Sequence, residues 1–356
     1  MAEYVSVDIG YGFVKAISSS GKRAIFPSVV GSGRERGLAS FLETSKKEID
    51  ESELHVKVNG KHYFVGEMAL RNSSDVSRVF DRVRFNHEYT MILLHVAIQL
   101  VADPAEDEIV IYTGLPLDYY KTQVKDFTAK LYEPFPTLEW QSGHSLLQSK
   151  RNRIVEARVF PQALSAIWAT LINADGRFTQ PELMVEGSQV AVIDIGFRTT
   201  DICVVEMKQG GGFIPVLNLS DTLDIGVVNL YENVKRAYQD ITGGAELSES
   251  KISKLLKTNS IKYKGKQFDL SEPIEKAHEA VVTSIFDRIH KLWKNEADTF
   301  DQIFLVGGGS HVFNDYFHRQ QPDMYKLIVD SQFANAIGYY RIGKMLSQNT
   351  NKAVTS

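Results

Sequence analysis

Two stretches of this sequence place an aspartate at the end of an apolar run, with a glycine two residues further on. The first is Val5-Ser6-Val7-Asp8-Ile9-Gly10, and the second is Val190-Ala191-Val192-Ile193-Asp194-Ile195-Gly196. Each apolar run is typical of a strand, and each glycine predicts a hairpin bend because a second apolar run follows it. One Asp-Ile-Gly is a weak signal, but two of them predict two similar half-domains that face one anion.

A bound phosphate chain sets chemical requirements for which both hairpins offer residues. Backbone N–H groups must approach the phosphate closely, which favours glycine, and a cation must neutralise its charge. Carboxylates must hold the magnesium ion, often through its waters. The phosphate candidates are Gly10, Gly12 and Lys15 in the first hairpin and Gly196, Thr199 and Thr200 in the second. Asp8 and Asp194 are magnesium candidates if the hairpins converge, although each alone is more simply a turn aspartate.

Two further segments carry candidate binding or catalytic residues. Gly307-Gly308-Gly309-Ser310 lies between a predicted strand and a predicted helix, which suits close approach of a planar or anionic ligand but equally suits a tight connection. It is neither a Walker sequence nor a dinucleotide-binding Gly-x-Gly-x-x-Gly. Gln162 opens a predicted helix, where its amide could orient a water molecule for in-line attack. A polar residue at a helix start is the simpler interpretation of Gln162.

Composition narrows the class of protein. The 356 residues suffice for roughly two domains, and the net charge of −4 does not predict direct binding to nucleic acid or to an anionic membrane. A single cysteine excludes a disulfide within the chain and indicates a cytoplasmic protein. The nine histidines have no metal-binding spacing. We interpret three of them as surface or helix-face residues: His87, His95 and His278.

The elements that must position the candidate residues follow from periodicity and turn signals. Asn59-Gly60 between alternating residues predicts a tight hairpin, and Pro27 makes the run 24–30 an edge strand. The other predicted strands are 108–113, 154–160, 214–219, 302–306 and 325–329. The predicted helices are 87–102, 162–171, one that begins after Gly226, 248–256, one that begins at Ser271, and 334–347. Strands that alternate with helices predict an α/β protein.

The ordered set of motifs resembles the actin and sugar-kinase superfamily. Asp8 to Lys15, Pro161-Gln162-Ala163, Asp194 to Asp201, Gly307 to Ser310 and Phe333 to Gly338 resemble, in that order, its first phosphate loop, first connecting segment, second phosphate loop, adenosine loop and second connecting segment. Within it, Tyr112-Thr113-Gly114-Leu115-Pro116 and the Phe-Ala-Asn-Ala sequence at residue 333 are similar to plasmid-segregating bacterial actins of the ParM/StbA type. They are also similar to the compact archaeal actin homologue.

The resemblance implies an actin-like fold of two ribonuclease H-like halves around a nucleotide cleft, each a mixed five-stranded sheet with helices. Domain I would comprise 1–170 and 333–356, with a small inserted subdomain at about 24–86. Domain II would comprise 171–332, with an inserted subdomain at about 226–290. The C-terminal helix would cross back to domain I.

The resemblance also implies a role for each site residue. Asp8 and Asp194 would organise Mg²⁺ through water, Gln162 would position the attacking water, and Gly226 would lie on the ribose side. ATP would be the nucleotide, with GTP as the alternative. The phosphates would be contacted by Gly10, Tyr11, Gly12, Lys15, Gly196, Arg198, Thr199 and Thr200, and the nucleoside would be bordered by Gly307, Gly308, Gly309 and Ser310.

Two positions depart from the family pattern. Bacterial members often carry glutamate where this chain has Gln162, and glutamine cannot take a proton, so orienting water is its expected role. Phe197 and Arg198 are bulkier than the small residues of actin's second loop, which puts the backbone contacts there in doubt.

The implied function is an ATPase that polymerises into dynamic filaments on binding Mg-ATP and disassembles after hydrolysis. Such a protein would move plasmid DNA through a DNA-bound adaptor protein. The alternative is a small-molecule kinase, which needs a carboxylate base that we do not identify. A chaperone-type ATPase is disfavoured because no peptide-binding domain follows residue 350. A membrane-linked division actin is disfavoured because 348–352 is polar.

Overall fold

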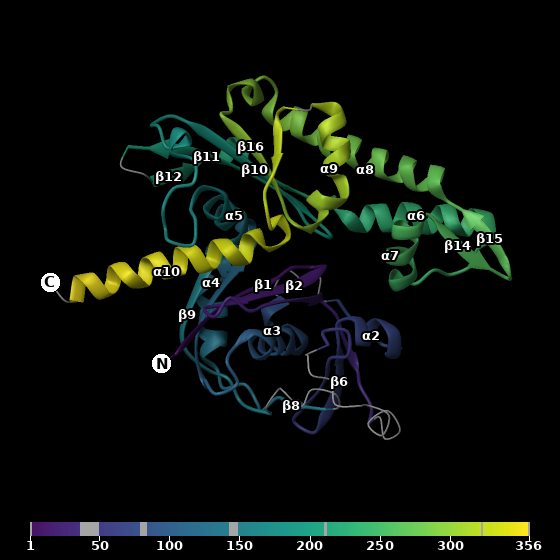
Figure 1. The fold of residues 1–356 in the computed structure, drawn as a ribbon, viewed down its shortest axis with the longest axis horizontal. Helices are drawn as coiled ribbons and strands as arrows, with labels where there is room; N and C mark the ends of the chain where they lie inside the picture. The colour runs from purple at the N-terminus through teal and green to yellow at the C-terminus, as the bar shows by residue number, and fades with distance from the viewer. Residues whose placement is uncertain are drawn as a thin grey trace. The chain divides into compact units, whose positions relative to one another are not determined.

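The computed structural model describes residues 2–35, 50–78, 84–141, 149–209, 212–321 and 323–354. The chain divides into two compact units (Figure 1): Met1–Thr179 with Phe333–Ser356, and Gln180–Gln332. Parts of the predicted inserted subdomain at 24–86 lie outside the described residues. Each unit is built on a mixed sheet with helices, as the expected fold requires.

The sheet of the first unit has the strand order β3-β2-β1-β7-β9. Its strands are β1 Glu3–Ile9, β2 Phe13–Ser18, β3 Arg23–Pro27, β7 Glu108–Leu115 and β9 Arg153–Pro161. β1 pairs with β2 as an antiparallel hairpin and with β7 in parallel. The predicted edge position of β3 is confirmed, as is the first hairpin. The Asp-Ile-Gly sequence predicted the hairpin, and Pro27 predicted the edge strand.

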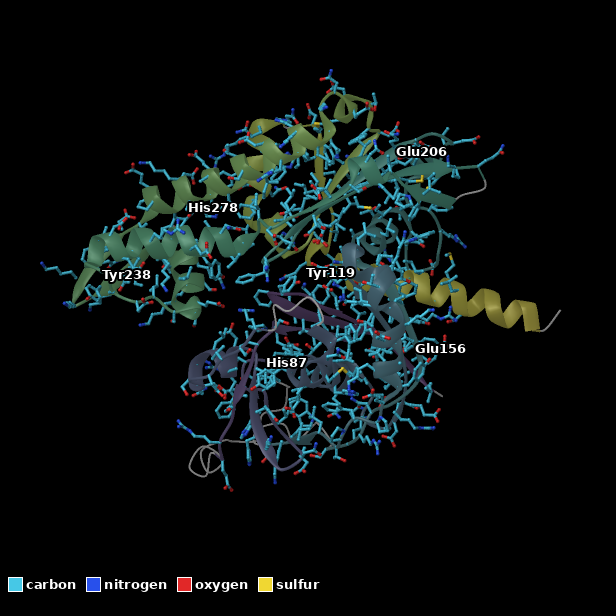
Figure 2. The ribbon with its side chains drawn as sticks, turned by 180° about the vertical axis from the view of Figure 1, so that it is seen from behind. His87, Tyr119, Glu156, Glu206, Tyr238 and His278 are labelled. Atoms are coloured by element: carbon cyan, nitrogen blue, oxygen red, sulfur yellow. The ribbon has the colours of Figure 1, made fainter. Side chains whose placement is uncertain are left out.

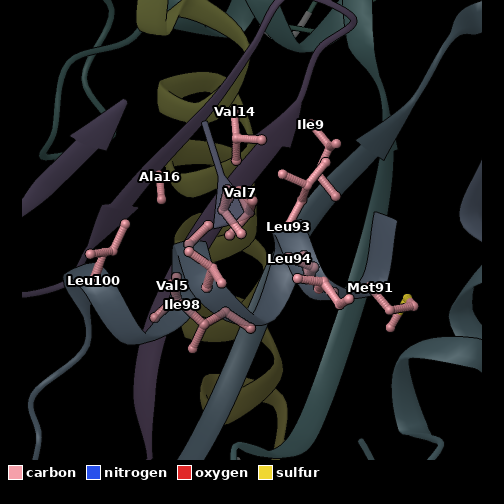
Figure 3. Close-up of a cluster of buried hydrophobic side chains, with 14 of the residues drawn as sticks. Val5, Val7, Ile9, Val14, Ala16, Met91, Leu93, Leu94, Ile98 and Leu100 are labelled. Atoms are coloured by element: carbon pink, nitrogen blue, oxygen red, sulfur yellow. The ribbon is translucent and has the colours of Figure 1, made fainter. Parts of the chain in front are cut away.

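Helices cover this sheet. They are α3 Glu88–Val101, α4 Leu117–Tyr132, α5 Gln162–Leu171 and α10 Ala334–Val354. Figure 3 shows apolar side chains of β1 and β2, such as Val7 and Val14, beside Leu94 and Ile98 of α3. α10 returns from the end of the chain to pack on α5, and the hydroxyl of Ser6 donates to the carbonyl of Ala336 at 2.6 Å. This interaction ties the last helix to β1, the strand that carries Asp8.

A smaller sheet in the first unit has the order β4-β6-β5-β8. Its strands are β4 Val30–Ser32, β5 His55–Val58, β6 Lys61–Val65 and β8 Glu139–Trp140, and α2 Glu67–Asn72 follows β6. The predicted Asn59-Gly60 hairpin is confirmed, with φ angles of 49° and 80° at the two residues. Positive φ at both positions is what this short turn requires.

His95 lies on a helix, as expected, but the alternative expectation that it lies at the surface is wrong. His95 is buried on α3, its ring stacks on Phe135 at 4.0 Å between centroids, and its Nδ1 lies 3.2 Å from the amide nitrogen of Asn152. One turn further along α3, Trp140 donates to Gln99 at 2.7 Å. These contacts cover the polar residues of α3, while its apolar residues pack on β1 and β2, so both sets are buried. Burial lowers the pKa of His95 to about 3.

Replacing His95 with glutamine is expected to reduce the acid sensitivity of the fold. The folded pKa of about 3 lies below the ordinary value of 6.5, so the unfolded chain binds the proton more readily between these values. Stability is therefore intact above about pH 6.5 and falls as the pH drops toward 3. Between pH 7 and 5 the ring accounts for a loss of about 2 kcal/mol. Urea unfolding of both proteins at these two pH values checks this, and an equal pH response would contradict it.

The sheet of the second unit has the order β12-β11-β10-β16-β17, and a sixth strand, β13, pairs with β11. The strands are β10 Gln189–Ile195, β11 Thr200–Lys208, β12 Gly212–Pro215, β13 Asp221–Leu223, β16 Gln302–Val306 and β17 Tyr325–Leu327. The second predicted hairpin is confirmed as β10 and β11. The predicted strand 214–219 is wrong beyond Pro215, because Leu217–Leu219 forms a 3-10 turn that leads into β13.

Helices and a small hairpin complete the second unit. The helices are α6 Val227–Thr242, α7 Glu249–Thr258, α8 Ser271–Trp293 and α9 Gly308–Gln320, and the hairpin is β14 Ser260–Tyr263 with β15 Lys266–Asp269. Short 3-10 turns lie in both units. The first unit has one at Arg84–Asn86, and the others are Pro181–Leu183, Glu296–Thr299 and Ser331–Phe333. His278 on α8 (Figure 2) stacks on Tyr316 of α9, which fits its expected helix-face position. Within the described residues, no helix combines the length and apolar character that crossing a bilayer requires.

Candidate functional site

Two side chains of the first hairpin meet a third from the start of α5. Asp8 is 3% exposed, and its carboxylate accepts from Lys15 Nζ at 3.1 Å through Oδ2 and from Gln162 Nε2 at 3.3 Å through Oδ1. Asp8 and Lys15 lie opposite each other in the β1–β2 register, while Gln162 is the first residue of α5. The sequence predicted all three as site residues, and the structure brings them together.

Backbone geometry explains why these side chains converge. The N–H of Gly10 donates to the carbonyl of Phe13 at 3.1 Å, which closes the bend between β1 and β2. β7 separates β1 from β9, and β9 runs directly into α5 at Pro161. Parallel β1, β7 and β9 therefore end at the same edge of the sheet, where Asp8 and Gln162 lie.

The ion pair of Asp8 and Lys15 is largely desolvated, since the two side chains are 4% and 13% exposed. A desolvated pair is held by its geometry and its added hydrogen bonds, here the amide of Gln162. Because the amide nitrogen of Gln162 donates to Asp8, its carbonyl oxygen is left as the acceptor. This arrangement provides a cation for a phosphate, a carboxylate for a divalent ion and an acceptor for a water molecule.

The bend between β10 and β11 carries the candidates of the second unit. Asp194 is the second-last residue of β10 and is 7% exposed, and the N–H of Gly196 donates to the carbonyl of Thr199 at 2.8 Å. The hydroxyl of Thr200 donates to the carbonyl of Ile225 at 2.8 Å. Thr200 is thus engaged with the segment that precedes α6, and Thr199 and Gly196 form the bend itself.

The start of α6 packs on this bend. The N–H groups of Val227 and Val228 donate to the carbonyls of Gly196 and Phe197 at 3.2 and 2.7 Å. Gly226 directly precedes the helix, and its N–H donates to the side chain of Asn229 at 2.9 Å. The predicted ribose-side residue therefore lies beside the predicted phosphate bend. Arg198, 4.0 Å from Asp224 across an exposed pair, lies on the same bend.

The glycine run lies beside Asp194. β16 pairs in parallel with β10, with Val306 opposite Asp194, and α9 begins directly after Gly307. Gly307 has φ 85°, and a Cβ there would meet Asp194 Oδ1 and the carbonyl of Ile195. The hydroxyl of Ser310 donates to the carbonyl of Val306 within the structure. In the second unit, the structure thus brings together Asp194, the bend at Gly196 and the start of the glycine run.

Replacing Gly307 with alanine is expected to destabilise the second unit by about 3 kcal/mol. Positive φ costs a non-glycine residue about 1–2 kcal/mol, and a clash with backbone adds to it. Gly187 is the matched control, because it has φ 84° but nothing within 4 Å of its Cβ position. Gly187→Ala should therefore cost only about 1 kcal/mol. Thermal unfolding of both variants tests this, and equal shifts would contradict the close packing at Gly307.

Two residues at these sites were not predicted from the sequence. The side chain of Asn229 accepts a hydrogen bond from the N–H of Gly226, the residue before α6. A polar residue three positions after a helix start is a capping signal that could have indicated Asn229. Arg78 donates from Nη1 to the carbonyls of Tyr11 and Gly12 at 3.2 and 3.0 Å. No local signal pointed to Arg78, because the two segments are far apart in the chain.

Each bend offers one carboxylate of the kind that magnesium uses when it is bound together with a nucleotide. Among the described residues, no three histidine, cysteine, aspartate or glutamate side chains gather to hold a metal. Magnesium in nucleotide sites commonly uses one or two carboxylates, phosphate oxygens and water. Asp8 and Asp194 are carboxylates of that kind, each at a strand end beside a glycine bend.

Comparison with known proteins gives two family matches. Residues 6–164 match the N-terminal domain of actin-like proteins, and residues 192–319 match the C-terminal domain of the MreB-like archaeal actin homologue. The archaeal actin homologue of Thermoplasma volcanium is 26% identical over 346 residues, which cover 94% of this chain and 97% of that protein. The one from Thermoplasma acidophilum is 27% identical with the same coverage.

Solved structures give a matching result. A non-polymerisable quadruple mutant of pCBH ParM has a TM-score of 0.83 and 28% identity over 97% of this chain and 100% of that chain. A 15-stranded ParM filament from Clostridium botulinum has a TM-score of 0.83 and 29% identity, over 97% of this chain and 99% of that chain. An archaeal actin homologue in complex with ADP has a TM-score of 0.76 and 23% identity, over 97% of this chain and 100% of that chain. At this level of identity the comparison shows that the fold is shared.

Proposed function

Because this chain is an actin-like protein of the ParM type, we propose that it binds ATP with magnesium, assembles into filaments and hydrolyses the nucleotide. Its cargo would be plasmid DNA, reached through a DNA-bound adaptor protein. The observation that carries the proposal is the cluster of Asp8, Lys15 and Gln162 at the first glycine bend. Support for assembly comes from the ParM filament to which the chain is similar.

In this proposal the first bend binds the phosphate chain. Lys15 would move its charge from Asp8 to a phosphate oxygen, and Asp8 would then orient a water ligand of the magnesium ion. Gly10, Tyr11 and Gly12 would contact the phosphates, with the N–H groups of Tyr11 and Gly12 as donors because that of Gly10 already donates to Phe13. The magnesium ion would neutralise charge on the phosphates when bound. The net charge at Asp8 and Lys15 need not change, because each exchanges one partner of opposite charge for another.

The second bend and the glycine run would bind the rest of the nucleotide. Thr199, Arg198 and Gly196 would contact phosphates, and Asp194 would orient a second water ligand of magnesium. Gly226 would border the ribose, and the glycine run 307–310 would border the nucleoside. Gln162 would hold the attacking water through its carbonyl oxygen, since its amide nitrogen already donates to Asp8.

Electron microscopy and pelleting of the purified protein with ATP, ADP and a non-hydrolysable ATP analogue test the proposal. We expect filaments with ATP and the analogue, and their loss as ADP accumulates. Protein that binds ATP yet stays monomeric at high concentration would defeat the assembly step. Hydrolysis that rises strongly with one metabolite, with that metabolite phosphorylated, would instead favour a small-molecule kinase.

A further inference from the structure

Arg78 belongs to the inserted part of the first unit but contacts the first hairpin bend. Its Nη1 donates to the carbonyl of Tyr11 at 3.2 Å and to the carbonyl of Gly12 at 3.0 Å. The backbone N–H of Ser28 also donates to the carbonyl of Gly12, at 2.8 Å. A half-buried guanidinium thus lies against the bend proposed to hold the phosphate chain.

Two carbonyls that point toward one guanidinium fix the orientation of their peptide planes. In a trans peptide the C=O and the N–H that follows it point in opposite directions. The peptides of this bend are trans, so the N–H groups of Gly12 and Phe13 are turned away from Arg78. The cation also adds positive charge next to the bend, and a positive charge favours a bound anion.

Arg78 is held in place by its own segment, residues 73–78, which we call the strap. Val30 of β4 and Ser77 exchange two backbone hydrogen bonds of 3.2 and 3.0 Å. The carboxylate of Asp75 accepts from both the backbone N–H and the hydroxyl of Ser32, and these bonds hold the pKa of Asp75 below its ordinary value. The strap is therefore fixed along β4, and β4 pairs with β6 of the small sheet.

We propose that Arg78 is a positioning residue that holds the bend at Tyr11 and Gly12 in the arrangement that binds a phosphate chain. It acts through the backbone of the bend and links nucleotide binding to the strap and the small sheet. This inference rests on the proposed function, because it concerns the phosphates of the same nucleotide.

The inference predicts a loss of affinity that depends on the phosphates. Arg78→Ala should weaken binding of Mg-ATP and Mg-ADP by about 10- to 100-fold, the size expected for lost hydrogen bonds to a charged donor. Binding of adenosine should change less than about threefold, because adenosine lacks the phosphates that the bend would hold. Arg78→Lys keeps a charged donor and should recover part of the affinity.

Titration calorimetry of the full chain with Mg-ATP, Mg-ADP and adenosine tests this. Arg71→Ala is the matched control, since Arg71 lies on α2 of the same inserted part and pairs with Glu53 at 2.9 Å. Its nucleotide affinities should match the wild type, and thermal unfolding should show that every variant is folded. Unchanged ATP affinity in Arg78→Ala, or an equal loss for adenosine, would overturn the inference. A wild type that binds no ATP would overturn the proposed function itself and this inference with it.

Discussion

Replacing Asp194 with alanine is expected to slow ATP hydrolysis at least about 100-fold and to abolish ATP-dependent pelleting. A loss of rate of this size is expected when an enzyme loses a group that stabilises the charge of the transition state. Asp194 is buried at the end of β10, and Gly307 leaves room for it where a side chain would collide. Because this buried carboxylate occupies a space that only glycine at position 307 leaves open, we expect its removal to have a large effect on hydrolysis.

The matched control for Asp194→Ala is Asp201→Ala. Asp201 lies directly opposite Asp194 in the same hairpin, and it accepts a hydrogen bond from the hydroxyl of Thr222 at 2.6 Å. Its loss removes an equal charge from the same hairpin, yet it should leave hydrolysis within about threefold of wild type, as expected for a residue outside the chemistry. Phosphate release and light scattering measure both variants. Equal effects would show that Asp194 supports the hairpin rather than the reaction.

Local signals were sufficient to predict both hairpins and the candidates within them. The Asp8–Lys15 pair follows from the β1–β2 register once the bend is fixed at Gly10. The Asn59-Gly60 turn was predictable in the same way, because two adjacent residues determine its backbone. In each case the residues that determine the turn lie within a few positions of each other, so a short stretch of sequence is enough to predict it.

Contacts over long sequence separations were not predictable from local patterns. Gln162 meets Asp8 across 154 positions and Arg78 meets Gly12 across 66, so nothing near either residue indicates its partner. Family resemblance supplied a role for Gln162 but not for Arg78. The error at His95 is different, because α3 is apolar nearly all round its circumference and such a helix is buried on every side. The surface interpretation considered one apolar face only, whereas Phe135 and Asn152 cover His95 on another.

Replacing Gln162 with alanine is expected to slow hydrolysis about 10- to 100-fold while leaving ATP-dependent assembly intact. Positioning a water molecule accounts for a rate effect of this order. The variant loses the 3.3 Å hydrogen bond to Asp8 but keeps both Lys15 and Asp8, the proposed phosphate and magnesium ligands, so nucleotide binding should persist. Filaments should therefore live longer, because disassembly follows hydrolysis. Phosphate release and filament lifetime by microscopy give the two readouts.

Gln162→Glu separates orientation of water from support of Asp8. It would place a second carboxylate about 3.3 Å from Asp8, and two like charges at that distance raise the pKa of one of them. The variant should hydrolyse ATP with a pH dependence that the wild type lacks, since a neutral amide does not titrate. Unchanged phosphate release in Gln162→Ala would remove Gln162 from the reaction. If Gln162→Ala instead lost nucleotide affinity together with rate, its amide would serve chiefly to hold Asp8, and the water would need another acceptor.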